Sequence, residues 1–168
     1  MATSACSGRI AHSWSYVHRE RCAASCAGQA LLDARAPATG AGFAVLVAPR
    51  GSLSLLLRDD GGAQGNLTLD GACASLLARA EPPLHHVALI VDGAARVALA
   101  VVDGFLCNGG DDGARGWAYL PMALGALTPA PTFKWGGDFG GQVAGGRWFA
   151  RALSVTEAVG NSRAGPPQ

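Results

Sequence analysis

Two short apolar runs, each followed by an Asp-Gly dipeptide, constrain the fold of this chain more than any other feature. Residues 87–91 and 97–102 contain only Val, Leu, Ile and Ala, and the dipeptides Asp92-Gly93 and Asp103-Gly104 follow them. Apolar runs of this length between turn-forming residues are typical of consecutive antiparallel strands. We therefore predict a meander of three strands, with the third strand beginning after Asp103-Gly104.

The register of the first hairpin can be argued from which residues would share a face, because directly opposed residues lie on the same side of a sheet. A two-residue turn at Asp92-Gly93 would set Leu89 opposite Arg96. A three-residue loop over 93–95 sets Leu89 opposite Leu99 and gathers the large side chains on one face. We predict the second register, and we base the sandwich assignment on Leu89 and Leu99 sharing an inner surface between two sheets.

The second turn has the composition of a tight two-residue hairpin. A turn at Asp103-Gly104 sets Val101 opposite Leu106 and continues the bulky face. The meander would then present a Val/Leu face to a core and an Ala-rich face to a close neighbour. This arrangement is typical of one half of a β-sandwich.

Strand-like segments recur along the rest of the chain. They occupy residues 29–34, 43–48, 52–58, 66–69, 117–120, 132–135 and 142–150. Their spacing of about 8–12 residues favours a sandwich over a parallel α/β sheet. The 24 glycines and the charged content of only 15% agree with a turn-rich chain. We predict an all-β fold, an antiparallel β-sandwich.

One short helix is expected near the C-terminus. Ser154 and Glu157 have the spacing of a capping box, in which Ser caps the first turn and Glu reaches back to the cap. We predict a helix over 155–160 that ends at Gly160-Asn161.

The central hairpin and the C-terminal segment carry a resemblance to a known family. His-His-Val-Ala at 85–88 and Val-Val-Asp-Gly at 101–104 resemble the central hairpin of laminin G-like domains, members of the concanavalin A-like lectin/glucanase superfamily. Residues 149–159 are similar to the closing strand and terminal helix of these domains. The resemblance implies a jelly-roll sandwich that binds a glycan or an extracellular protein partner through its rim loops, without catalysis.

The resemblance also sets the expected domain limits. It covers residues 28–164, which we assign to the sandwich, and it leaves 165–168 as a tail. Residues 13–17 alternate like a strand, but the segment 1–27 as a whole matches no family pattern and is left uncertain.

Charge and cysteine content exclude some classes of protein. The net charge is +1 and the basic residues are scattered, so no basic stripe indicates nucleic-acid binding. No apolar run is long enough for a membrane span. No apolar signal segment is present in the first 30 residues, but five cysteines favour an extracellular or secreted location.

Catalytic carboxylates are not arranged as a glycosidase needs them. Such enzymes use two carboxylates on facing positions, and glucanases of the superfamily carry Glu-x-Asp-x-Glu on one strand. The three glutamates, Glu20, Glu81 and Glu157, do not form this pattern. We therefore expect a non-enzymatic recognition module. A degenerate glucanase-like hydrolase and a purely structural accessory domain are the alternatives.

Aspartates in Gly-rich loops are candidates for calcium binding, since Ca²⁺ prefers several oxygen ligands from flexible loops and many laminin G-like domains hold calcium at the rim. The candidate ligands are Asp59, Asp60 and Asp138. Aspartate is also common in turns that bind no metal.

Adjacent His85 and His86 would point to opposite faces of a strand, so we expect a structural role for them and no zinc site.

Exposed aromatic residues beside loops could stack on sugar rings. Trp117 and Trp135 flank Gly/Asp loops and are the candidate glycan platform, together with Asp111 and Asp112 of the loop that precedes Trp117. Trp148 alternates with strand residues and is expected to fill the core.

The resemblance implies one disulfide. Cys73 and Cys107 match a cysteine pair that flanks the central hairpin in some laminin G-like sequences. The bond would close a loop of about 35 residues and contribute at most about 4 kcal/mol in the chain-entropy model. Three cysteines, Cys6, Cys22 and Cys26, would remain. The triplet beginning at Asn66 also fits the N-glycosylation pattern.

Overall fold

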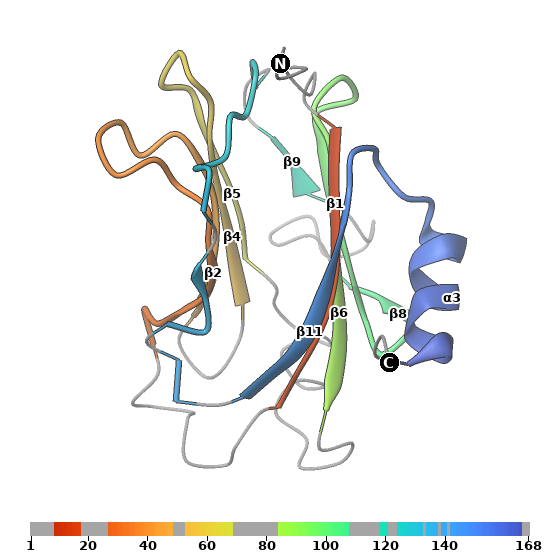
Figure 1. Ribbon diagram of the computed structural model, residues 1–168. Helices are drawn as coiled ribbons and strands as arrows, with labels where there is room; N and C mark the ends of the chain where they lie inside the picture. The colour runs from red at the N-terminus through yellow and green to blue at the C-terminus, as the bar shows by residue number, and fades with distance from the viewer. Residues whose placement is uncertain are drawn as a thin grey trace.

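The computed structural model describes residues 9–17, 27–48, 53–68, 84–107, 118–120, 124–132, 134–137, 139–140 and 142–165. Within these residues the chain forms two antiparallel sheets that face each other, with one helix on the outside of the larger sheet (Figure 1). The predicted all-β sandwich with a C-terminal helix is therefore confirmed. No helix in the described part of the chain is long and apolar enough to cross a membrane.

The larger sheet has the strand order β11-β1-β6-β7-β8, and β9 also pairs with β7. Its strands are β1 (Arg9–Val17), β6 (His85–Asp92), β7 (Val97–Val102), β8 (Phe105–Leu106), β9 (Ala118–Tyr119) and β11 (Gln142–Phe149). β1, from the segment that the sequence left uncertain, lies between β6 and β11 and pairs with both.

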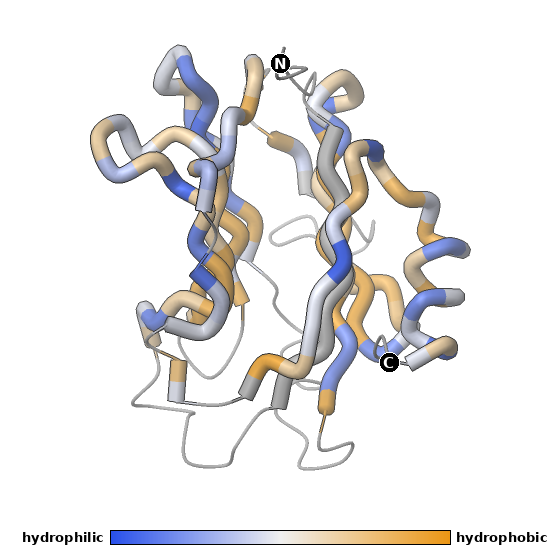
Figure 2. Tube along the Cα trace, in the orientation of Figure 1, coloured by the Kyte–Doolittle hydropathy of each residue, from blue (hydrophilic) through white to orange (hydrophobic). Residues whose placement is uncertain are grey.

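The smaller sheet has the order β10-β2-β3-β4-β5. Its strands are β2 (Ala30–Asp33), β3 (Gly42–Val47), β4 (Leu53–Arg58), β5 (Gln64–Thr68) and β10 (Lys134–Trp135). Figure 2 shows apolar segments in the strands of both layers and a hydrophilic loop between β4 and β5. The core between the sheets includes Phe43, Val45, Leu55, Leu57 and Leu89, all buried.

The register predicted for the β6–β7 hairpin is wrong by one residue. Leu89 lies opposite Ala100, and Leu99 lies opposite Ile90. The loop has four residues, 93–96, and within it the Asp92 carboxylate accepts the N–H groups of Ala94 and Ala95 at 3.0 and 3.1 Å. Arg96 completes the loop with a φ of +55°.

Leu89 and Leu99 therefore face opposite sides of the sheet. Leu89 belongs to the core between the sheets, whereas Leu99 packs in a second cluster with Ile90 and Ala158. Both faces of β6 and β7 are buried, because helix α3 (Val155–Ala164) packs against these strands. The two-sheet sandwich forms although Leu89 and Leu99 do not share an inner surface, so the predicted register was the wrong basis for this assignment.

The tight turn at Asp103-Gly104 is confirmed. Val101 lies opposite Leu106, and the two turn residues have φ values of +50° and +82°. Two consecutive positive φ angles are required by the hairpin turn that matches strand twist, and Asp-Gly supports them.

The capping box of α3 is confirmed, but its predicted end is wrong. Ser154 Oγ accepts the N–H of Glu157 at 3.2 Å, and Glu157 Oε2 accepts the N–H of Ser154 at 2.8 Å. The helix continues through Gly160 to Ala164, and Gly165 forms the C-cap with a φ of +76°. A glycine inside a helix costs only about 1 kcal/mol, which the burial of Ala158 against the sheet offsets.

Candidate functional site

The outer face of the smaller sheet combines apolar and polar side chains. Leu53, Leu55 and Leu57 of β4 are buried inward, so Leu56 and Arg58 lie on the opposite face. On β5, Gln64 and Asn66 are exposed. The strand register pairs Leu56 with Asn66 and Arg58 with Gln64, which brings these four side chains together.

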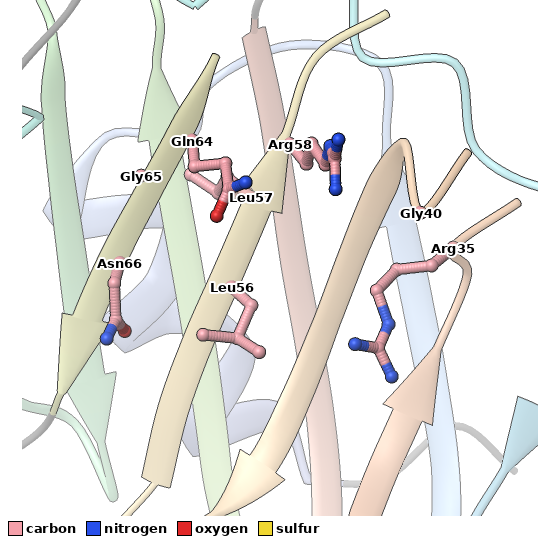
Figure 3. Close-up of a pocket in the computed structure, with 8 residues that line it drawn as sticks. All are labelled: Arg35, Gly40, Leu56, Leu57, Arg58, Gln64, Gly65 and Asn66. Carbon is pink, nitrogen blue, oxygen red and sulfur yellow. The ribbon is translucent and has the colours of Figure 1, made fainter. Parts of the chain in front are cut away.

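A pocket of about 450 Å³ lies on this face. Its lining residues are Arg35, Gly40, Leu56, Leu57, Arg58, Gln64, Gly65 and Asn66 (Figure 3). Figure 3 shows Leu56 between Asn66 on β5 and the guanidinium of Arg35. A small apolar floor bordered by a few polar groups is the usual composition of a site for a small organic ligand.

Arg35 is fixed by a carboxylate of β2. Its Nε and Nη2 donate to Oδ1 and Oδ2 of Asp33 at 2.9 and 2.7 Å, a bidentate pair. The hydrogen bonds from Arg35 lower the pKa of Asp33 below its usual value, and the same pair raises the pKa of Arg35. Arg35 therefore forms a wall of the pocket with its charge balanced and its orientation set.

Arg58 is held differently. It ends β4, and its side chain passes over Gly40, where an added Cβ would lie 3.4 Å from Nη1 and 3.8 Å from Cδ. Gly40 has a φ of +70°, so glycine is favoured there by its backbone conformation. Among the ion pairs between described residues, none involves Arg58.

A second hollow of about 500 Å³ adjoins the first, and Arg35 and Gly40 line both. Its other lining residues are Asp33, Ala36, Pro37, Ala130, Pro131, Thr132 and Lys134. The two hollows thus meet at Arg35 and Gly40, and together they are lined by residues of β2, β4, β5 and β10 and of the segments beside these strands.

The predicted calcium ligands have structural roles where the structure describes them. Asp59 is buried, and its Oδ2 and Oδ1 accept the N–H groups of Gly125 and Ala63, both at 2.7 Å. These bonds, led by that from Gly125, lower the pKa of Asp59. Asp60 Oδ2 accepts the Thr128 hydroxyl at 2.7 Å. The two aspartates tie the β4–β5 loop to residues 124–128.

Calcium binding stays a prediction. Asp138 lies outside the described residues, and among those described no group of three or more metal-ligating side chains occurs. A calcium ion at Asp59 would have to compete with two short N–H bonds for the carboxylate oxygens.

Of the predicted glycan platform, the structure describes only Trp135. Trp117, Asp111 and Asp112 lie outside the described residues. Trp135 is 41% exposed and covers Gly146 of β11, where any side chain would collide with the indole. Trp148 packs on Phe43 with ring centroids 4.8 Å apart and remains 37% exposed, so it fills the core only in part.

The structural role expected for the histidine pair is confirmed for His85. The side chain is buried, and Nδ1 lies 2.7 Å from Oδ2 of Asp103. Burial lowers the pKa of His86.

Cys107 is also buried, but Cys73 lies in a segment that is not described, so their disulfide stays a prediction.

Sequence reasoning placed the binding residues in rim loops and missed the pocket on the sheet. The missed residues are Arg35, Leu56, Arg58, Gln64 and Asn66. Alternation in β4 and β5 was a usable signal, because it shows which residues point away from the core. It could not show that Arg35, from another strand's end, completes the same pocket.

Comparison with known proteins supports the fold. No protein-family model matches the chain, and no curated protein matches it in sequence. The receptor-binding domain of botulinum neurotoxin C/D mosaic serotype is similar, with a TM-score of 0.70 and 11% identity over 96% of this chain and 37% of that chain.

Two similar structures contain sugars. The botulinum neurotoxin serotype D ligand-binding domain in complex with N-acetylneuraminic acid has a TM-score of 0.59 at 10% identity, over 94% of this chain and 37% of that chain. The Ruminococcus gnavus IT-sialidase CBM40 bound to α2,3-sialyllactose has a TM-score of 0.52 at 18% identity, over 92% of this chain and 82% of that chain. The chain thus spans 37% of the matched toxin domains. These similarities show a β-sandwich of the kind found in carbohydrate-binding domains.

Proposed function

We propose that this chain is a non-catalytic carbohydrate-recognition module that binds its glycan on the outer face of β4 and β5. The observation that carries the proposal is the pocket around Leu56, with the amides of Gln64 and Asn66 on one side and guanidinium groups on the other. Sugars present apolar C–H faces as well as hydroxyl groups. An apolar floor and amides that both donate and accept hydrogen bonds complement such a ligand.

The fold comparisons support this proposal, because two of the similar structures hold a sugar. The laminin G-like resemblance points the same way, since it implies a recognition module. A protein ligand at the same face is the competing possibility, and the test below separates the two.

The carboxylates near the pocket support binding rather than hydrolysis. A glycosidase needs one carboxyl group that can donate a proton and a second that acts as nucleophile or base. Asp33 is the only carboxylate that lines either hollow in the described part of the chain, and its bidentate pair with Arg35 keeps it ionised. Glu157 is engaged by Arg151 and by the helix cap.

We also propose an extracellular location, because a bond between Cys73 and Cys107 would persist in an oxidising compartment. Calcium is a variable in the test, because Asp59, Asp60 and Asp138 are its predicted ligands.

A glycan array with the wild-type chain, with and without calcium, tests the proposal. We expect binding to a defined set of sugars. Asn66→Ala should weaken that binding about tenfold, as expected for the loss of a ligand hydrogen bond of roughly 1.4 kcal/mol. Asn161→Ala, on α3 at the other side of the molecule, is the matched control and should bind normally. If the wild-type chain binds no sugar in either condition, the proposal is wrong.

A further inference from the structure

We propose that the pocket is selective for sugars that carry a negatively charged group, and that Arg58 is the residue that pairs with this group. The inference rests on the proposed function and adds the charge of the ligand and the residue that recognises it. It starts from the contrast between the two arginines of the pocket: Arg35 is balanced by Asp33, whereas Arg58 has no carboxylate partner among the described residues.

The carboxylates that follow Arg58 in the chain do not balance it. Asp59 is buried and accepts N–H groups of Gly125 and Ala63. Asp60 accepts the hydroxyl of Thr128. The loop after β4 therefore directs both carboxylates toward residues 124–128 and leaves the guanidinium beside the pocket.

The position of Arg58 suits a ligand contact. Its backbone is fixed in the sheet between Gly42 on β3 and Gln64 on β5. Its side chain passes over Gly40, a residue that lines both hollows. Arg58 is half-buried, and partial removal from water strengthens an ionic hydrogen bond relative to one at a fully exposed residue.

The charge of the whole face favours the same class of ligand. The two adjoining hollows are lined by three cations, Arg35, Arg58 and Lys134, and by one carboxylate, Asp33. A planar guanidinium can donate two parallel hydrogen bonds to a carboxylate or a sulfate, and both groups occur on sugars.

Isothermal titration with three matched sugars tests the inference: 3′-sialyllactose, which carries a carboxylate, 3′-sulfolactose, which carries a sulfate, and neutral lactose. We expect at least one of the anionic sugars to bind about tenfold or more tightly than lactose. Arg58→Gln should abolish this preference. Arg58→Lys should keep only part of it, because lysine carries the same positive charge but cannot donate two parallel hydrogen bonds as the guanidinium does. Comparison of 3′-sialyllactose with 3′-sulfolactose shows whether the pocket prefers a carboxylate or a sulfate.

Arg163→Gln, at the exposed end of α3, removes one positive charge away from the pocket and should leave the preference intact. Thermal melts of all variants check that the fold is retained. Equal binding of lactose and both anionic sugars, or an unchanged preference in Arg58→Gln, would overturn the inference while leaving glycan recognition in place. If no sugar of the array or of this series binds, the proposed function fails and the inference fails with it.

Discussion

Asp103 Oδ2 lies 2.7 Å from Nδ1 of His85, and Oδ1 of the same carboxylate accepts the N–H of His86 at 2.8 Å. One side chain in the β7–β8 turn thus fixes the beginning of β6 at the centre of the larger sheet. Asp103→Ala should lower the free energy of unfolding by about 1–3 kcal/mol, because His85 is left buried without this partner. Urea denaturation measures the change.

Asp103→Asn is the matched comparison. Asparagine keeps an acceptor for the His86 N–H and tolerates the φ of +50° at this position. It should therefore be more stable than Asp103→Ala. Equal stability of wild type and Asp103→Ala would show that the contact contributes nothing.

A second prediction concerns pH. Hydrogen bonds lower the pKa of Asp59, led by the Gly125 N–H. Burial raises the pKa of Asp103, but the bonds from His85 and His86 outweigh it, so its pKa is also lowered. A carboxyl group whose folded pKa lies below its unfolded value, about 3.9, stabilises the fold above that pH and loses this effect as pH falls. The melting temperature should therefore drop below about pH 4.

Asp59→Asn removes one of these titrating groups and should flatten the acid limb of the curve. Differential scanning calorimetry from pH 7 downwards measures both proteins. An acid limb of the same steepness in wild type and Asp59→Asn would contradict the assigned role of Asp59.

A third prediction tests the contact between the edges of the two sheets. Gly146→Ala would place a methyl group against the Trp135 indole, so we expect destabilisation of about 1–3 kcal/mol, as for overpacking elsewhere. Gly160→Ala, in α3 with open space around it, should instead stabilise by up to about 1 kcal/mol. The two melting curves should shift in opposite directions, and a Gly146→Ala melt at or above wild type would disprove the contact.

The fourth prediction links the glycosylation triplet to the pocket. Asn66 is exposed and lines the pocket, and Thr68 at the end of the triplet bonds to Ser54, with 2.8 Å between their hydroxyl oxygens. A glycan attached to Asn66 would occupy the pocket, so a chain glycosylated at Asn66 should lose the sugar binding that the same chain shows when it is produced in a host without N-glycosylation. Mass spectrometry establishes occupancy, and full binding by a chain glycosylated at Asn66 would contradict the location of the site.

The fifth prediction is the Cys73–Cys107 disulfide. Under denaturing, non-reducing conditions the chain should show at least two fewer free thiols than its five cysteines. Peptide mapping should then recover the two cysteines in one linked fragment. Five titratable thiols would exclude the bond.

The sequence predicted the β7–β8 turn but not the β6–β7 register, and the reason is physical. At Asp103-Gly104 the local conformation needs two positive φ angles, which the residues themselves indicate. In β6 and β7 both faces are buried, one by the other sheet and one by α3, so every residue of 87–91 and 97–102 is apolar. A pattern that is apolar on both faces cannot select between two registers.

The site was predictable only in part for a similar reason. Alternation in β4 separates Leu56 and Arg58 from the core residues, and this much is local information. That Asp33 balances Arg35 while Arg58 has no such partner among the described residues depends on the side chains that the fold brings near each arginine. Pairing of this kind cannot be inferred from spacing along the chain.

The most direct test of the proposed site is an NMR titration of the ¹⁵N-labelled chain with the tightest-binding sugar from the array. The account predicts that the largest amide shifts fall on Arg58, Gln64 and Asn66, with the amides of α3 unchanged. Shifts centred instead on the edge formed by Trp135 and Trp148, or on the face covered by α3, would contradict it.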